Sequence, residues 1–185
     1  MGFPKTLWTL WLAALCVACI PSLHPLYTTE DLIDEPLLIG TWTDGSDAFV
    51  FSPQGASAYL LTYEDSSGPG SFTVHLLQLG DYRLLDLLPD DALLSGRDDW
   101  YLSHYRPTHS FMAVEVSEES LALAHMDGQW LEKHLQSAPD DLAHEVIDGD
   151  IILTAGTEAL QHFVVEHYDT LFHSFDRYAR HDDSQ

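Results

Sequence analysis

Short β-forming segments separated by strong turn signals occupy the chain from about residue 37 to residue 126. Eight such segments are rich in aliphatic and aromatic residues: 39–43, 49–51, 58–63, 72–76, 82–88, 100–105, 111–116 and 121–126. Breakers stand between them, including Gly68-Pro69-Gly70 and the two-residue hairpin signal Gly80-Asp81. No segment resembles a long crossover helix. The pattern predicts an antiparallel meander of about eight strands, closed or nearly closed into a barrel.

The last third of the chain has a different periodicity. Apolar residues recur at helical spacing over 129–137, and Thr157 is expected to cap a helix running to about Tyr168, with 171–175 continuing it. Between these helices, 146–147 and 151–153 are expected to form strand pieces around Asp148-Gly149-Asp150. The fold class is therefore mainly β (α+β): an antiparallel meander or barrel of about eight strands with helices packed on it in the C-terminal third.

The first eighteen residues have the composition of an export signal. Lys5 is their only basic residue, an apolar run covers 7–18, and no acidic residue precedes Glu30. A membrane-spanning helix needs about 20 apolar residues, and this run is shorter and ends before Pro21. A retained transmembrane anchor is the less favoured interpretation.

The end of the apolar run, Leu15-Cys16-Val17-Ala18-Cys19, resembles the lipobox of bacterial lipoproteins. The resemblance implies cleavage before Cys19 and attachment of lipid to its thiol, and the membrane is then a partner through that lipid. Lipidation also explains a single cysteine in an exported chain, where free thiols are uncommon. Ordinary signal cleavage nearby is the alternative. Because Ile20 follows, and not Asp, the resemblance further implies an outer-membrane location facing the periplasm if the envelope is Gram-negative.

Three regions are expected: a signal peptide at 1–18, a tether at 19–36, and one globular domain at 37–185. Residues 19–185 hold all 30 acidic residues and all the basic residues except Lys5. This acidity disfavours nucleic acid and anionic lipid as partners, since both are bound through Lys and Arg. Cations or a basic protein suit it better, although high acidity also simply keeps a protein soluble.

Several stretches resemble a family of uncharacterised bacterial lipoproteins, for which the resemblance implies no activity. They are Ser22-Leu23-His24-Pro25-Leu26-Tyr27-Thr28, Leu38-Ile39-Gly40-Thr41-Trp42, Leu85-Asp86-Leu87-Leu88-Pro89, His109-Ser110-Phe111, Leu142-Ala143-His144-Glu145 and Ile152-Leu153-Thr154-Ala155. The Gly40-Thr41-Trp42 triplet also resembles the Gly-x-Trp of lipocalins, which implies that Trp42 plugs the closed end of an eight-strand barrel.

The sequence argues against an enzyme without excluding one. It contains no Gly-x-Ser-x-Gly, Ser-x-x-Lys, His-Glu-x-x-His or phosphate-binding glycine-rich loop, and it points to no cofactor. For a metal, the candidates are His104 and His109, which flank a turn, with Asp98 or Asp99 as an oxygen ligand. The plainer interpretation is that both histidines bond the loop locally.

Trp42, Tyr59 and Asp86 are the candidates for a ligand site inside the barrel. Asp86 lies between Leu85 and Leu87, so its side chain is expected to point opposite to both, toward solvent. In a hollow barrel the same alternation directs it inward as a polar anchor for a small apolar ligand. Sequence alone does not separate a hollow barrel from a filled one. Two functions remain open: a membrane-tethered binder of a small apolar ligand, and an interaction or scaffold protein of the cell envelope with a filled core.

Overall fold

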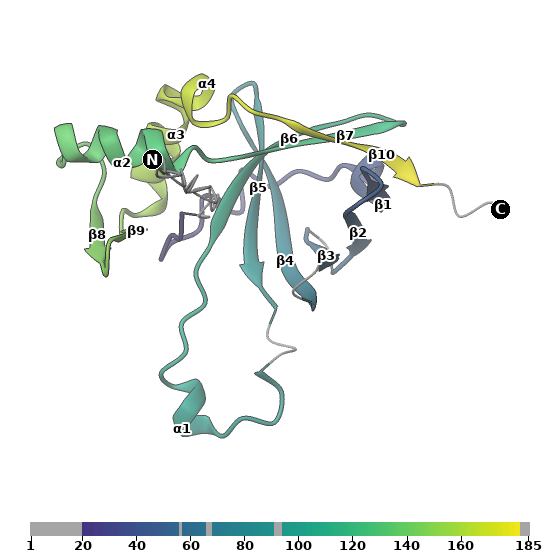
Figure 1. The fold of residues 1–185 in the computed structure, drawn as a ribbon, viewed down its shortest axis with the longest axis horizontal. Coiled ribbons are helices and arrows are strands. Elements are labelled where there is room, and N and C mark those ends of the chain that lie inside the picture. Colours follow the sequence, from purple (N-terminus) through teal and green to yellow (C-terminus); the bar gives the residue numbers. More distant parts are fainter. Residues whose placement is uncertain (1–19, 56, 66–67, 91–93, 182–185) are drawn as a thin grey trace, which may run out of the picture.

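Eight antiparallel strands close into a barrel (Figure 1), which confirms the expected fold class. The computed structural model of the chain describes residues 20–55, 57–65, 68–90 and 94–181. The barrel strands are β1 (Gly40–Thr43), β2 (Ala48–Pro53), β3 (Tyr59–Asp65), β4 (Gly68–Leu79), β5 (Tyr82–Pro89), β6 (Ser110–Val116), β7 (Ser120–His125) and β10 (Asp176–His181). Each pairs with its neighbour in the chain, and β10 pairs with both β7 and β1 to close the ring.

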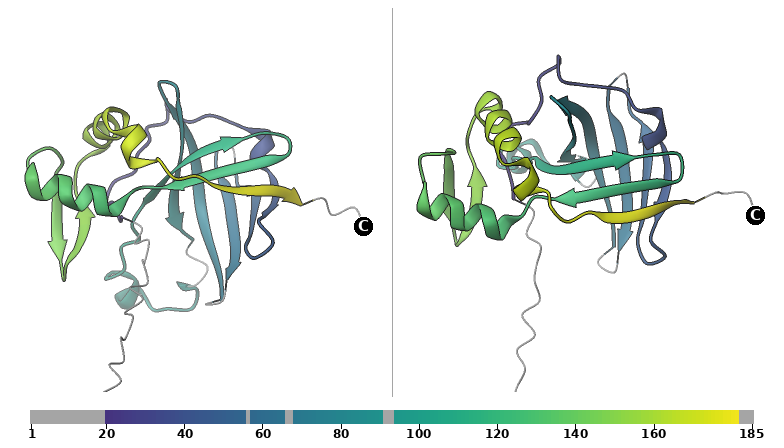
Figure 2. Two further views of the ribbon diagram at one scale, coloured as in Figure 1. Left: turned by 45° about the horizontal axis from the view of Figure 1, so that its top comes forward. Right: turned by 90° about the horizontal axis from the view of Figure 1, so that it is seen from above.

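The longest helices of the described residues lie in an insertion between the seventh and the last barrel strand. This insertion contains α2 (Gly128–Ser137), the hairpin β8 (His144–Ile147) and β9 (Asp150–Leu153), α3 (Thr157–Glu166) and α4 (Tyr168–Leu171). Figure 2 shows these elements gathered against one side of the barrel. Among the described residues, no helix has the length and apolar character that crossing a bilayer requires.

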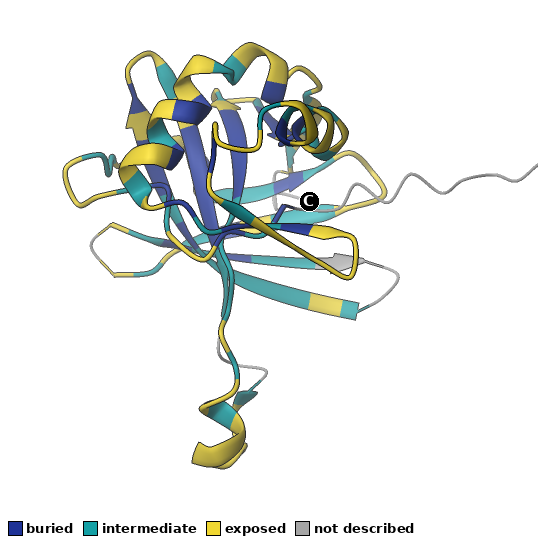
Figure 3. Cartoon of the chain, turned by 90° about the vertical axis from the view of Figure 1, so that its left-hand side faces the viewer, coloured by how far each residue is buried: buried dark blue, intermediate teal, exposed yellow. Residues whose placement is uncertain are grey.

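Strand alternation divides the buried side chains into two clusters, one inside the barrel and one outside it. On β5, Leu85 and Leu87 point inward, whereas Leu84 points outward. The inward-facing cluster contains thirteen buried residues and includes Trp42, Tyr59 and Met112. Figure 3 shows the buried residues concentrated on the strands and on the helix faces turned toward them.

The outer cluster joins the barrel to the inserted helices and to the segment that precedes the barrel. Phe111 and Leu84 from the barrel wall pack in it with Leu131 of α2, Leu160 of α3 and Leu26 of the N-terminal segment. Burial at about 25 cal/mol per Å² of apolar surface makes this second layer part of the folded core and not a loose attachment.

One expected strand is wrong. Residues 100–105 are not in a strand: α1 (Asp99–Leu102) lies there, on a long excursion between β5 and β6. The side chain of Asp98 accepts a hydrogen bond from the backbone N–H of Tyr101 at 2.9 Å and caps this helical turn. The eighth barrel strand is instead β10, a segment for which no strand or helix was expected. The expected number of barrel strands is confirmed, but one expected segment is not a barrel strand and β10 takes its place.

The segment expected to be a free tether, 19–36, is packed against the barrel from Ile20 onward. Ser22 and Leu26 are completely buried, the backbone of Ile33 donates to Leu76, and that of Gln78 donates to Asp31. The segment lies along the outside of the barrel because Leu26 fills the outer cluster, so it is part of the domain and not a free linker.

Candidate functional site

A buried carboxyl on the outer wall of the barrel holds the N-terminal segment in place. Asp86 of β5 points outward, as the alternation predicts, but it is fully buried beneath residues 20–26 and does not reach solvent. Its Oδ2 accepts a hydrogen bond from the backbone N–H of Leu26 at 2.7 Å. Its Oδ1 is hydrogen-bonded to Nδ1 of His109 at 2.6 Å. Asp86 therefore faces neither solvent nor the barrel interior, and it is not an anchor for a ligand inside the barrel.

The same segment is bonded on its other side by the inserted layer. Thr157 Oγ1 donates to the carbonyl of Pro25 at 2.8 Å, and Gln161 Nε2 donates to the carbonyl of Leu26 at 2.9 Å. The N-cap of α3 is Gly156, and Thr157 is the first residue of the helix. The Thr157 hydroxyl therefore does not cap the helix as expected but bonds the N-terminal segment. The segment ties the helices to the barrel.

Backbone pairing completes the attachment. Ser22 exchanges two hydrogen bonds with His109, each 2.8 Å long. On the opposite side, Leu153 of β9 donates to the carbonyl of Pro21 and accepts from the N–H of Leu23. Residues 21–23 thus act as a short extra strand between the barrel and the β8–β9 hairpin.

Five of the six stretches that carry the lipoprotein resemblance meet at this place. Ser22–Thr28 contacts the stretches containing Asp86, His109 and Leu153 through the bonds just described. The fifth joins through Ala143, whose carbonyl accepts from the N–H groups of Thr154 and Ala155 at 3.0 Å. These five stretches therefore form the contacts that hold residues 20–28 against the barrel, which we call the clamp, and the sixth forms the barrel end at Trp42.

Two further titratable side chains lie against Asp86. His75 is its neighbour across β4 and β5, and the ring of Tyr27 stacks on His75 with centroids 4.3 Å apart. Burial lowers the pKa of His75, against the opposing effect of Asp86, and the nearby His109 lowers it further. Burial, reinforced by Asp86, raises the pKa of Tyr27. Both groups are thereby held in their uncharged forms near neutral pH.

The Asp86–His109 pair has the carboxyl and imidazole of a hydrolytic site, but no nucleophile is bonded to it in the part of the chain that the structure describes. A carboxyl that orients an imidazole is the arrangement used to activate a serine or cysteine nucleophile. In the described ranges, however, no hydroxyl or thiol is hydrogen-bonded to the His109 ring, and Ser22 Oγ donates to the carbonyl of His24 instead. What the arrangement does is satisfy buried donors of the N-terminal segment.

Trp42 and Tyr59 lie together inside the barrel, at the end covered by the 3-10 helix Pro36–Leu38. Trp42 Nε1 donates to the carbonyl of Leu38 at 2.9 Å, and the Tyr59 hydroxyl accepts from the N–H of Glu35 at 2.8 Å. Trp42 is where the Gly-x-Trp resemblance implies. Because both polar atoms bond to the covering segment, these side chains seal the barrel end, and Asp86 lies outside the wall, away from them.

Arg180 of β10 completes the sealed end, and the sequence analysis missed it. Its guanidinium lies over the Trp42 ring, 4.2 Å from the centroid. It also donates to the carbonyls of Leu37 and Ile39 at 2.6 and 2.9 Å. The sequence offers no signal for this contact, because Arg180 is 138 positions from Trp42 and its strand lacks apolar alternation.

The two histidines proposed for a metal have separate surroundings. His104 follows α1 and its ring packs edge-on against Trp100, with centroids 5.0 Å apart. His109 is bonded to Asp86. Over the residues that the structure describes, no three His, Cys, Asp or Glu side chains gather as metal ligands would. The His104 ring stays within its own excursion, whereas the His109 ring is bonded across the sheet to Asp86 of β5, so local bonding to the loop does not describe His109.

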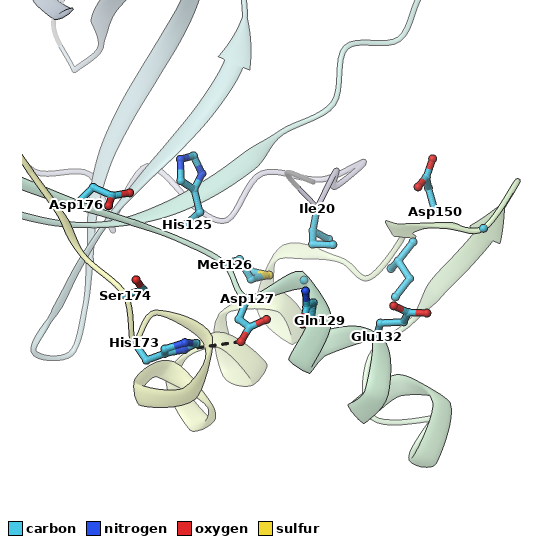
Figure 4. A pocket seen from close by; sticks show the side chains of 13 residues that line it. Ile20, His125, Met126, Asp127, Gln129, Glu132, Asp150, His173, Ser174 and Asp176 are labelled. Carbon is cyan, nitrogen blue, oxygen red and sulfur yellow. Dashed lines mark ion pairs between the residues drawn. The ribbon is translucent and has the colours of Figure 1, made fainter. Parts of the chain in front are cut away.

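An open cavity of about 630 Å³ lies beside Ile20, the first described residue (Figure 4). Its floor is apolar, with Met126 and Ile151, whereas four carboxylates stand around it: Asp127, Glu132, Asp150 and Asp176. His125 and His173 also line it, and burial lowers the pKa of His125 against the effect of Asp176. No Lys or Arg is among the lining residues. Such a cavity suits a cationic group and disfavours an anion.

No family model, curated protein or solved structure matches this chain. The function proposed below is therefore derived from the contacts, burial and charges of this chain's own residues. Cys19, the expected lipidation site, lies outside the described residues.

Proposed function

We propose that this chain is a lipid-anchored protein of the cell envelope whose barrel is a filled interaction module and not a ligand carrier. The observation that supports this most is the inward-facing cluster, in which thirteen buried side chains fill the barrel and include the two aromatic candidates for a ligand site. None of these thirteen residues lines the cavity beside Ile20, nor either of two further surface cavities formed by described residues of β4 and α3. The surfaces left for recognition are outside the barrel.

The clamp on residues 20–26 supports the anchor. A free tether after Cys19 would let the domain move far from a membrane, at about 3.3–3.6 Å of reach per residue. Here the chain is fixed from Ser22 onward by His109, Leu153 and Asp86. A lipid on Cys19 would consequently hold the barrel close to the bilayer in a defined orientation. This is the arrangement expected of a scaffold that presents one surface to partners.

Lipidation is tested by comparing Cys19→Ser with Cys16→Ser, each expressed in cells of the organism that encodes the chain. We expect the unaltered chain and Cys16→Ser to sediment with membranes and to have the mass of residues 19–185 plus a diacylglyceryl group. We expect Cys19→Ser to lose both properties. Membrane association and an unchanged mature mass in Cys19→Ser would refute the anchor.

The filled barrel is tested by native mass spectrometry of the chain produced without its lipid. We expect the mass of the polypeptide alone. A co-purifying apolar molecule that is lost in Tyr59→Phe, which removes the hydroxyl contact with Glu35 but keeps the ring, would instead favour the ligand-binding function. A molecule retained in that variant and lost in Asp150→Asn would place the ligand in the acidic cavity.

A further inference from the structure

The most exposed large apolar side chains of the described residues are concentrated on two projections. Five side chains exceed all others in exposed fraction: Trp100 at 76 %, Val146 at 59 %, Ile147 at 54 %, Leu23 at 49 % and Tyr101 at 48 %. Trp100 and Tyr101 belong to α1, Val146 and Ile147 to the tip of the β8–β9 hairpin, and Leu23 is bonded to the edge of β9. Exposed apolar groups gathered in this way mark a contact surface.

The two projections extend from the same side of the molecule. In Figure 1, and again in the left view of Figure 2, α1 and the tip of the β8–β9 hairpin both point downward from the body. The hairpin tip is held in this direction by a two-residue turn, in which Asp148 and Gly149 have φ of +55° and +98°. Positive φ at both turn residues gives a turn whose twist matches that of the two strands, so the hairpin tip has a defined conformation.

The start of the described chain lies beside the hairpin. Ile20 shares one cavity wall with Gly149, Asp150 and Ile151, which form the turn and the start of β9 (Figure 4). Consecutive Cα atoms are about 3.8 Å apart, so Cys19 is one residue step from a point fixed against the hairpin. A lipid on Cys19 would therefore be attached one residue from Ile20, which lies beside the turn of this hairpin.

We propose that Leu23, Val146, Ile147, Trp100 and Tyr101 form a membrane-contact face that rests on the bilayer carrying the Cys19 lipid. This inference depends on the lipid anchor proposed above. Tryptophan and tyrosine prefer the headgroup level, where the ring is apolar on one side and hydrated on the other. The aliphatic tip adds apolar area that a single lipid chain alone does not supply, which strengthens attachment.

The charges around this face indicate which lipids it contacts. Glu145, Asp148 and Asp150 accompany the hairpin tip, so anionic headgroups are repelled there. The excursion carrying α1 has charges of both signs, with Arg97 and Arg106 beside Asp98 and Asp99, so it favours neither an anionic nor a cationic surface. The face therefore fits a zwitterionic lipid surface. Its carboxylates limit the depth to which it inserts to the headgroup region.

The test places a fluorescent label on the face in the lipidated protein. In the mature chain Cys19 is the only cysteine and its thiol carries the lipid, so Ile147→Cys and Trp100→Cys each provide one free thiol. The control is Val50→Cys on the outer wall of β2, an exposed aliphatic position on the barrel. Each variant is labelled with an environment-sensitive dye and reconstituted into phosphatidylcholine vesicles that contain a headgroup-proximal nitroxide lipid.

We expect blue-shifted emission and nitroxide quenching at positions 147 and 100, and neither at position 50. We also expect both effects to weaken when phosphatidylglycerol replaces half of the phosphatidylcholine. Equal quenching at all three positions, or none at 147 and 100, overturns the membrane-contact face even if mass spectrometry finds the lipid. A blue shift without quenching means that a second protein copy covers the face, and it too overturns the proposal. Absence of the lipid overturns the anchor and this inference together.

Discussion

At the scale of single residues, Asp86 is the side chain on which the clamp depends. Its carboxyl is fully buried and bonded both to the Leu26 N–H and to His109. Asp86→Asn keeps the size of the side chain but loses the charge that strengthens both bonds, and hydrogen bonds to charged groups contribute about 1.5–3 kcal/mol. We expect the free energy of unfolding, measured with urea, to fall by about that amount.

The matched control is Asp81→Asn on the exposed turn between β4 and β5, where a change of less than about 0.5 kcal/mol is expected. A stronger readout is proteolysis, because Asp86→Asn should also expose residues 20–26 to cleavage under native conditions. If Asp86→Asn unfolds at the same urea concentration as the unaltered chain, the carboxyl does not hold the segment.

His75 makes the same region sensitive to pH. Its pKa is lowered in the folded state by burial, against the effect of Asp86 and with that of His109. Below the unfolded value of about 6.5, the unfolded chain binds a proton that the folded chain does not, so stability decreases as the pH falls through 6.5 toward the lower pKa of the folded state. We expect thermal unfolding scans to show a smaller loss over this range in His75→Phe, which retains the stack on Tyr27. His162→Phe at an exposed site of α3 should behave like the unaltered chain.

The direction of the Asp86 side chain was predictable and its surroundings were not. Alternation between Leu85 and Leu87 sets the outward direction on a strand. The cover over it comes from Leu26, sixty positions away in the chain. No local pattern encodes a contact at that separation, and the Pro- and acid-containing segment around Leu26 has no periodicity that would predict packing. The aromatic candidates Trp42 and Tyr59 were correctly grouped, because both lie on inward-facing strand positions.

At the scale of elements, β10 decides whether the barrel is closed. It is bonded to β1 on one side and to β7 on the other, and it carries Arg180 into the sealed end. A chain ending at Phe175 would leave two unpaired strand edges and an exposed Trp42. We expect it to show no cooperative thermal transition by circular dichroism. Arg177→Ala, which removes only an exposed ion pair with Glu115 and keeps the strand, should unfold as the unaltered chain does. A native transition in the shortened chain would show that seven strands suffice.

The two errors in strand assignment have a common physical origin. Residues 100–105 contain four large aromatic or aliphatic residues (Trp100, Tyr101, Leu102 and Tyr105) and have strand propensity, but the Asp98 cap and the lack of a partner strand favour a helical turn. Asp176–His181 consists mainly of charged and polar residues without apolar alternation, and only pairing on both edges makes it a strand. Strand formation depends on the neighbours more than on the segment itself. By contrast, 128–137 and the hairpin around Asp148-Gly149 were predictable, because helical periodicity and turn chemistry are local.

At the scale of the whole molecule, the dominant feature is charge. The chain has a formal net charge of −23, and its described ion pairs with Lys or Arg are two, Arg83–Glu35 and Arg177–Glu115. Both are partly or largely exposed, so each contributes about 1 kcal/mol or less. Repulsion among the remaining carboxylates therefore opposes folding more than these pairs assist it.

Screening this repulsion should stabilise the fold. The Debye length falls from about 30 Å at 0.01 M salt to about 10 Å at 0.1 M, which is shorter than most separations between surface charges. We expect the thermal midpoint of the chain without its lipid to rise between 0.01 and 0.5 M NaCl, by about 2–4 °C for each kcal/mol of repulsion removed. Asp140→Asn combined with Asp148→Asn, both at exposed positions, should raise the midpoint at low salt and reduce its dependence on salt. A midpoint that falls with salt would mean that attractive pairs outweigh the repulsion. The acidic surface would then be a stabilising network and not a cost of remaining soluble.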